Sequence, residues 1–263
     1  MVRDYVSGAG SASRFFRGKP GDVGGFRAKA KELDGAFTPE RRALLRDLIR
    51  PVGPSGGAML DKAIQPGGYF VTTGQQPGLF GGPLYSLYKA LTAVRLAEEL
   101  SGLLSAPVMP LFWIASDDHD WEEANHTYLI DGGNQLRKLS LGPHPDPVRR
   151  SLCLTPLGAA VDPLIDALEG ILPPSDSSAG YVAAVREHYR PEASASDAFV
   201  GLLRVLLSGT AIGFVDSAAP ALKSASVPLL ARELERAEAG EQTLSATTAA
   251  LESEGYKPQV VLR

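Results

Sequence analysis

The order of apolar and polar residues predicts a strand, a helix and a second strand in the middle of the chain. Residues 69–73 and 108–115 form short, nearly continuous apolar runs, which are typical of strands covered on both faces. Between them, residues 83–104 carry apolar side chains at helical spacing, and their predicted buried face consists of Leu84, Leu87, Leu91 and Val94. Two buried strands joined by a helix predict parallel pairing with a crossover connection.

Further elements are predicted on both sides of this unit. Before it, helical spacing indicates helices over residues 26–33, 39–49 and 58–64. After it, residues 127–131 and 135–141 predict a hairpin around the turn Gly132-Gly133-Asn134. The remaining expected elements are helices over 157–171, 179–189 and 196–207, a surface loop at 173–178, a strand over 211–215, and a helical region to about Ser253 with a break near Gly240.

The three predicted strands end at Thr73, Ala115 and Val215, and we expect these ends to lie side by side. In open α/β sheets, ligands bind beyond the carboxyl ends of the strands. The residues that we expect to line one cleft there are Gln75, Gln76, Asp118, His119 and Asp216.

A glycine-rich turn follows the first of these strands. Its backbone can approach a ligand closely because it contains Gly74, Gly78, Gly81 and Gly82. Pro83 suits the first position of the next helix, where a missing N–H costs nothing. A turn before a helix N-terminus is suited to binding anions such as phosphate. The alternative is a tight turn without a ligand, but the amides of Gln75 and Gln76 favour the ligand site.

An acidic segment follows the second strand. At least one of Asp118, His119 and Asp120 is expected to have a direct role in the site. The alternative is a helix N-cap, because Glu122 and Glu123 follow at helical spacing.

No metal bound by protein side chains alone is expected. The candidate ligands are Asp118, His119, Asp120 and His126. Adjacent residues rarely all converge on one ion, and the sequence has no H-x-x-x-H pair, so this set is not expected to bind Mg²⁺ or Zn²⁺. Asn125 could reach the site from the next turn or act as a cap. Lys89, two turns into the central helix, is expected to be solvated.

Composition excludes several classes of protein. The 263 residues carry a formal net charge of −4 and no basic block, which does not suit nucleic-acid binding. The sequence contains no run of about 18 apolar residues, the length that would indicate a membrane span. The single Cys153 cannot form an internal disulfide or a multi-thiolate zinc site, and it fits a cytoplasmic protein.

Three motifs resemble the bacillithiol-synthase family, the cysteine ligases of bacillithiol biosynthesis. They are residues 73–85 (TGQQPGLFGGPLY), 112–125 (FWIASDDHDWEEAN) and 255–260 (GYKPQV). The resemblance implies a cytoplasmic enzyme that joins cysteine to the amino group of glucosaminyl-malate. It also implies an α/β fold with a Rossmann-like parallel sheet related to class I aminoacyl-tRNA synthetases, inserted connecting segments, and a helical coiled-coil domain.

The resemblance spans the whole chain but only about the first half of a typical member. We therefore expect a core truncated at the C-terminus, with residues 260–263 in the middle of a strand, and a homodimer formed through the absent coiled coil. The expected division is a helical segment packing on the core (1–65), the first half of the core (66–130), a hairpin and helical insertion (131–208), and the second part of the core (209–263).

The implied reaction requires an activated carboxylate, since cysteine does not acylate an amine unaided near neutral pH. ATP is therefore a candidate cosubstrate, with its phosphates on the glycine turn. Where a class I synthetase carries a His-x-Gly-His motif, this chain has Gln75-Gln76-Pro77-Gly78, and it has no Walker Lys-Ser/Thr. The predicted catalytic residues are Asp118, His119 and Asp120, any of which could hold or deprotonate the amine of the implied reaction. The predicted binding residues are Gly74, Gln75, Gln76, Gly78, Gly81, Gly82, Asn125 and Asp216.

Two other functions remain open from the sequence. One is a nucleotidyl or phosphate-ester enzyme that binds phosphates on the glycine turn and a divalent ion at the acidic strand end. The other is a non-catalytic fragment that binds the ligand without turning it over.

Overall fold

The computed structural model describes residues 1–19, 21–145 and 148–260, which form two compact units. One unit comprises Met1–Ala36 with Ala221–Arg263, and the other comprises Phe37–Pro220. This division separates residues 1–36 from 37–65, which the sequence placed in one segment. The finer division into 1–65, 66–130, 131–208 and 209–263 stays a prediction.

The larger unit contains a four-stranded sheet in the order β1-β6-β3-β2. β2 (Tyr69–Gln75) pairs parallel with β3 (Val108–Ile114), and β3 pairs parallel with β6 (Gly213–Asp216). The predicted parallel core is present in β2, β3 and β6, but the sheet as a whole is mixed, because β1 (Ile49–Pro51) pairs antiparallel with β6. The sequence placed residue 49 at the end of a helix, and a three-residue strand is too short to show a period of its own.

The carboxyl ends of the three parallel strands lie side by side, as predicted. Gln75 is opposite Ile114, and Ile114 is opposite Asp216. Polar residues that follow β2, β3 and β6 therefore emerge at the same edge of the sheet.

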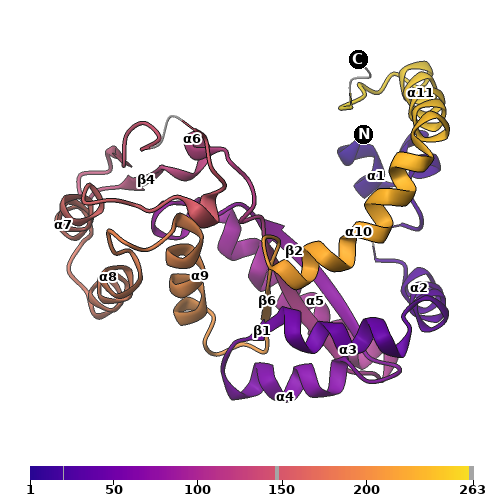
Figure 1. Cartoon of the computed structure of the whole chain (residues 1–263), viewed down its shortest axis with the longest axis horizontal. Coiled ribbons are helices and arrows are strands. Elements are labelled where there is room, and N and C mark those ends of the chain that lie inside the picture. The colour runs from indigo at the N-terminus through magenta and orange to yellow at the C-terminus, as the bar shows by residue number, and fades with distance from the viewer. Residues whose placement is uncertain (20, 146–147, 261–263) are drawn as a thin grey trace. The chain divides into compact units, whose positions relative to one another are not determined.

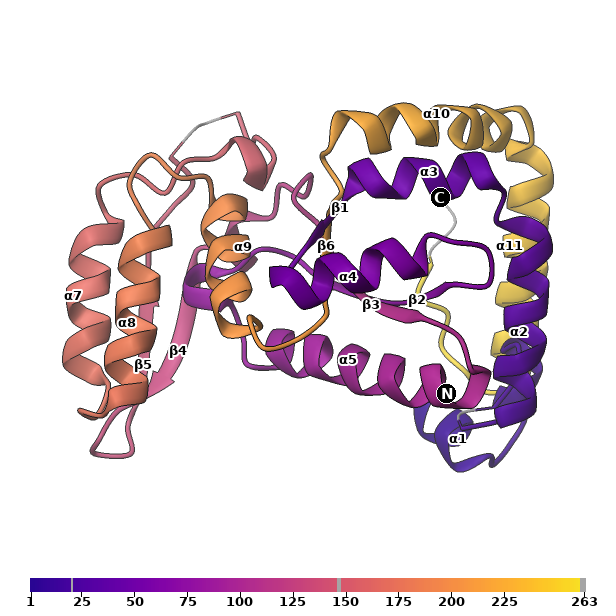
Figure 2. The ribbon, with the colours of Figure 1, turned by 90° about the horizontal axis from the view of Figure 1, so that it is seen from below.

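Helices cover both faces of the sheet (Figure 2). α5 (Tyr85–Leu104) and α9 (Ala195–Leu206) pack on the face that carries Phe112, where Phe112, Phe199 and Phe214 form part of one buried cluster. α3 (Pro39–Leu48) and α4 (Gly53–Ala63) lie toward the other face. The ring of Phe70 on that face meets Phe37, with the ring centroids 6.3 Å apart.

α5 buries a different face from the one predicted. Leu84 and Leu91 are 63% and 41% exposed, whereas Leu87 and Val94 pack against the core as expected. Small side chains allow a helix backbone to approach a sheet closely, and the larger leucines then remain at the margin of the contact. The buried positions of α5 are Ser86, Ala90, Ala93, Ala97 and Leu100.

An excursion from the sheet separates β3 from α9 (Figure 1). The predicted hairpin is confirmed as β4 (His126–Ile130) paired antiparallel with β5 (Leu136–Ser140). It follows the short α6 (Trp121–Ala124) and precedes α7 (Val161–Ile171) and α8 (Asp176–His188). α8 begins inside the predicted loop at 173–178, because the hydroxyl of Ser175 caps it by accepting from the Ser178 N–H.

The smaller unit is helical in its described part. Its long helices are α2 (Val23–Ala36), α10 (Pro220–Glu235, which begins at the last residue of the larger unit) and α11 (Ala237–Ser253), and its short ones are α1 (Val2–Ser7) and η1 (Ala12–Phe15). The helix break lies at Arg236 and not near Gly240, which is inside α11. Of the strand expected at 260–263, Val260 lies in a bend, and residues 261–263 lie outside the described residues. None of the described helices is long and apolar enough to cross a membrane.

Candidate functional site

The glycine segment forms a loop that closes on itself between β2 and α5. A Cβ on Gly78 would lie 2.7 Å from the Cα of Gly82, so the two backbones meet more closely than any side chain permits. Gly81 and Gly82 have φ values of 89° and 68°, in the left-handed region that glycine adopts readily. Gly74 has a packing role, because its Cβ would lie 2.7 Å from the carbonyl oxygen of Trp113 on β3.

Two tyrosines of α8 and its C-terminus hold this loop. The hydroxyl of Tyr189 donates to the Gly78 carbonyl (2.8 Å) and accepts from the Gly81 N–H (2.9 Å). The hydroxyl of Tyr181 donates to the Phe80 carbonyl (2.7 Å). Burial raises the pKa of Tyr181 to about 12 and also raises the pKa of Tyr189, so both phenols stay neutral donors near neutral pH.

This arrangement limits which amides could bind a phosphate. The Gly81 N–H is taken by Tyr189, and the Gly82 N–H donates to the Leu79 carbonyl at 3.0 Å. Pro83 does not occupy the first helical position as predicted, because the turn at Gly82 delays the helix, which begins at Tyr85. A phosphate cradle on this loop would have to use its other amides.

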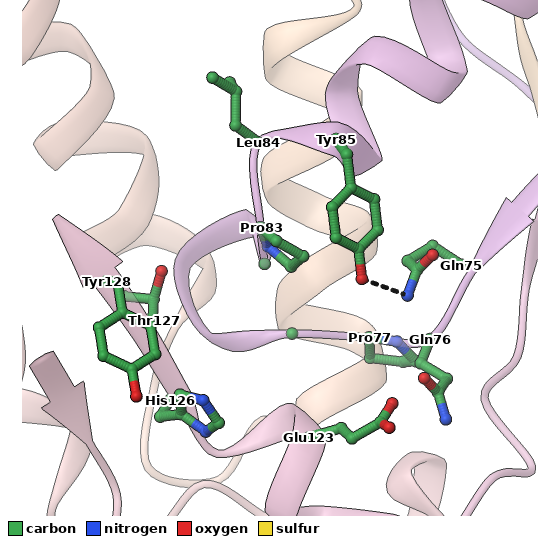
Figure 3. Close-up of a pocket in the computed structure, with 12 residues that line it drawn as sticks. Gln75, Gln76, Pro77, Pro83, Leu84, Tyr85, Glu123, His126, Thr127 and Tyr128 are labelled. Atoms are coloured by element: carbon green, nitrogen blue, oxygen red, sulfur yellow. Dashed lines mark hydrogen bonds between the residues drawn. The ribbon is translucent and has the colours of Figure 1, made fainter.

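A cavity of about 470 Å³ lies between the loop, the start of α5, and the α6–β4 segment. Figure 3 shows its lining side chains. Gln75 comes from the end of β2, Gln76 from the loop and Tyr85 from α5, whereas β4 contributes His126, Thr127 and Tyr128. Of the predicted binding residues, those that line the cavity are Gln75, Gln76, Gly78 and Gly82.

Gln75 is fixed by two side chains of α5. Its Nε2 donates toward the hydroxyl of Tyr85 (3.4 Å), and its Oε1 accepts from the ammonium of Lys89 (2.8 Å). Lys89 is solvent exposed, as the sequence predicted, but its ammonium is also held at the end of β2.

Gln76 joins the ends of two strands. Its Nε2 donates to Oδ2 of Asp118 at 2.5 Å. That bond is the largest of the influences that lower the pKa of Asp118, and the backbone N–H groups of Asp120 and His119 add to it. Asp118 therefore stays ionised near neutral pH and presents a fixed negative charge beside the cavity.

His119 and Asp120 lie next to Asp118 but outside the residues that line the cavity. The His119 side chain is 69% exposed, with its Nδ1 4.0 Å from Oδ1 of Asp118. Asp120 is the N-cap of α6 and accepts from the Glu123 N–H at 3.2 Å, which is the capping role the sequence left open. Asn125 is buried, and its Nδ2 donates to the Gly142 carbonyl at 2.7 Å, which fixes the chain after β5.

Asp216 belongs to a separate polar cluster between the ends of β3 and β6. It accepts hydrogen bonds from the Ser116 hydroxyl and from the Ala218 N–H. Ser217 donates to Asp117 in the same cluster. Burial, followed by the charge of Asp216, raises the pKa of the nearby Cys153 thiol, so Cys153 remains protonated near neutral pH.

The structure thus brings together part of the predicted site. Of the five residues expected in one cleft, Gln75 and Gln76 line the cavity, Asp118 contacts Gln76, and His119 and Asp216 lie outside the lining. Their roles in function stay predictions. Within the described residues, no three His, Cys, Asp or Glu side chains gather in a way that could hold a metal ion.

Sequence reasoning missed one wall of the cavity. That wall consists of Glu123, His126, Thr127 and Tyr128, and Tyr85 was missed on the other side. The polar and aromatic residues directly after the acidic segment were the available signal. Their placement depends on the hairpin folding back toward the glycine loop, which no local pattern specifies.

The chain matches a known family along its whole length. The family model described as Bacillithiol biosynthesis BshC, N-terminal Rossmann-like domain, matches residues 1–263. A protein of Salinibacter ruber is 31% identical over 98% of this chain and 48% of its own length, and one of Solibacter usitatus is 36% identical over 89% and 43%. One of Symbiobacterium thermophilum is 39% identical over 62% of this chain and 31% of its own length. All three carry the name "Putative cysteine ligase BshC", and the matches cover less than half of each relative.

Proposed function

The chain belongs to the BshC family of bacillithiol biosynthesis, and from that membership we propose that it forms part of a ligase joining cysteine to the amino group of glucosaminyl-malate. The observation that carries this proposal is the cavity at the carboxyl edge of the sheet, with Asp118 tied to its wall by Gln76. Ligands of open α/β sheets bind at this edge.

The lining of the cavity suits an aminosugar. The amides of Gln75 and Gln76 and the hydroxyls of Tyr85 and Tyr128 can donate to and accept from sugar hydroxyls. Aromatic rings additionally offer apolar faces to the C–H side of a sugar ring. The carboxylate of Glu123 on the opposite wall, shown in Figure 3, would attract the ammonium of the sugar.

The three residues of the acidic segment, Asp118, His119 and Asp120, would have different roles in the reaction. A carboxylate whose pKa is lowered is a weak base, so Asp118 would hold the ammonium in place and stabilise positive charge. His119 then remains the candidate to accept the proton, because a ring nitrogen of an imidazole can act as a general base. Asp120 would contribute through its cap on α6, which positions this segment.

We also propose that ATP activates the cysteine carboxylate and that the core is related to class I aminoacyl-tRNA synthetases. The reaction supports the first point, because amide formation from a free carboxylate needs a leaving group. The strand, loop and helix at the carboxyl edge of the sheet support the second. The amides of the loop other than those of Gly81 and Gly82 would contact the phosphates.

The test combines activity in a relative with binding in this chain. The full-length relative from Salinibacter ruber is incubated with cysteine, glucosaminyl-malate and ATP, with each omitted in turn, and the amide product and the nucleotide product are measured by mass spectrometry. We expect product only when all three are present. Formation of product without ATP would overturn the activation step, and absence of product from the complete mixture would overturn the ligase. Binding of glucosaminyl-malate to this chain, measured by calorimetry, is expected to weaken when Gln76 is replaced by alanine.

A further inference from the structure

Lys89 is held in a fixed position at the edge of the cavity. Lysines on the exposed face of a helix usually extend into water, but the Lys89 ammonium donates to Oε1 of Gln75 at 2.8 Å and to the Gly74 carbonyl at 3.4 Å. It also lies 5.1 Å from the centroid of the Tyr85 ring. Both Gln75 and Tyr85 line the cavity, so the cation is in direct contact with the wall.

The partners of Lys89 leave its charge unneutralised. In the described part of the chain no carboxylate oxygen lies within 4.0 Å of its ammonium, whereas several other exposed cations pair with acids, as Arg186 does with Asp166 and Glu169. An ammonium has three N–H donors, and the neutral acceptors use two of them. One donor and a full positive charge therefore remain for a ligand.

A second hollow shares a lining residue with the cavity. It is a groove of about 340 Å³ between β2 and α5, and both Lys89 and Tyr85 line it. Tyr85 lines the cavity as well, and the Lys89 ammonium lies 5.1 Å from the centroid of its ring. A ligand that extends from the cavity along α5 would pass this cation.

We infer that Lys89, oriented by Gln75 and Tyr85, is the carboxylate subsite of this cavity. The inference rests on the proposed function, and it deepens it by assigning a cation to the acidic part of the substrate. Glu123 lines the cavity, and Lys89 contacts the lining side chains Gln75 and Tyr85, so the site offers a negative group for an ammonium and a positive group for a carboxylate. Cysteine and glucosaminyl-malate each carry both groups.

The experiment separates the two sources of the carboxylate. Calorimetry measures the binding of cysteine, cysteamine, glucosaminyl-malate, glucosamine and free malate to the unaltered chain and to Lys89→Met. Cysteamine lacks the carboxylate of cysteine, and glucosamine lacks the malate group. Lys89→Arg keeps the charge, and Lys62→Met removes an exposed lysine on α4 that does not line the cavity.

We expect Lys89→Met to weaken the binding of one carboxylate ligand about tenfold, the effect of losing one charge-assisted contact. The binding of its analogue without a carboxylate should stay within about twofold of the unaltered chain. Lys89→Arg should retain most of the affinity, and Lys62→Met should change none of it. The ligand that responds identifies which carboxylate Lys89 binds.

Three outcomes decide the inference. Suppose that cysteine or glucosaminyl-malate binds. If Lys89→Met has no effect, or if it weakens the binding of a ligand and of its carboxylate-free analogue equally, Lys89 is not the carboxylate subsite and the proposed function stands. If malate binds in a Lys89-dependent manner but neither substrate binds, the subsite stands and the proposed function is wrong. If none of the five compounds binds, the assignment of Lys89 as a carboxylate subsite is wrong, and product formation by the full-length relative decides the proposed function separately.

Discussion

Gln76 and Asp118 join the ends of β2 and β3 through a hydrogen bond of 2.5 Å between side chains that are 42 residues apart in the sequence. Gln76 follows the last residue of β2, and Asp118 follows β3 by four residues. The bond gives the ionised carboxylate a fixed position beside the cavity, and it connects two of the three family motifs, those at residues 73–85 and 112–125.

Replacing Gln76 by alanine should raise the pKa of Asp118 toward its ordinary value, because the Gln76 amide is the largest influence that lowers it. A carboxyl whose folded-state pKa is depressed contributes stability above its unfolded value of about 3.9, and this contribution is lost as the pH falls through the folded-state pKa. Gln76→Ala should therefore lower the free energy of unfolding by about 1 kcal/mol at pH 7 and less at pH 3. A carbon-detected NMR titration of the carboxyl and urea unfolding at both pH values measure the two effects.

Gln75→Ala is the matched control. The Gln75 side chain bonds to Tyr85 and Lys89, whereas Asp118 bonds to Gln76. It should leave the Asp118 titration unchanged. An equal shift of the Asp118 pKa in both variants would show that the glutamine amide is not its cause.

Tyr189→Phe should destabilise the glycine loop. The variant keeps the buried ring but leaves the Gly78 carbonyl and the Gly81 N–H without their shared partner. Unsatisfied buried polar groups of this kind cost about 1–3 kcal/mol, and urea unfolding measures the change. Hydrogen exchange at the Gly81 amide should accelerate beyond the change expected from global stability alone.

Tyr88→Phe controls for removal of a hydroxyl, because Tyr88 is 59% exposed on α5. It should change the free energy of unfolding by less than about 0.5 kcal/mol, as is usual for exposed positions. If Tyr189→Phe is equally mild, the hydroxyl does not hold the loop.

Gly74→Ala and Gly102→Ala should have opposite effects. At Gly74 the new methyl would lie 2.7 Å from the Trp113 carbonyl oxygen, so β2 and β3 must separate, and overpacking of this kind costs about 1–3 kcal/mol. At Gly102, inside α5, no atom lies within 4 Å, and alanine should stabilise the helix by up to about 1 kcal/mol. Urea unfolding of the two variants checks both signs, and a stabilised Gly74→Ala would refute the close approach of the strands.

Strong local patterns made much of the fold predictable. Buried strands, turn glycines and helix periodicity gave β2, β3, the β4–β5 hairpin and the adjacency of the strand ends. The errors have a common cause, because burial also depends on partners distant in the sequence. The alanines of α5 are buried because they fit close to the sheet, and β1 exists because β6 offers it a partner.

The candidate site could also be predicted only in part. Residues on the strand ends could be named from the sequence, since topology alone brings them to one edge. Which of these residues share a cavity could not be predicted, because it depends on side-chain hydrogen bonds. Asp216 accepts from Ser116 and Ala218, whereas Gln76 donates to Asp118. The proposed role of Lys89 could not be predicted either, because it depends on a hydrogen bond to Gln75, which lies 14 residues earlier in the sequence.

The cluster around Asp216 should suppress the reactivity of Cys153. Only the thiolate is nucleophilic, and burial first, then the charges of Asp216 and Asp117, raises the pKa of this thiol. Asp216→Asn removes one of these charges, so the pKa should fall and alkylation by iodoacetamide at pH 8 should become several-fold faster. Cys153 is the only cysteine in the chain, so mass spectrometry of the intact protein follows the reaction directly. Asp162→Asn, an exposed change of equal charge on α7, should leave the rate unchanged. If the two variants react at the same rate at every pH, the charge of Asp216 does not reach the sulfur, and burial alone sets its pKa.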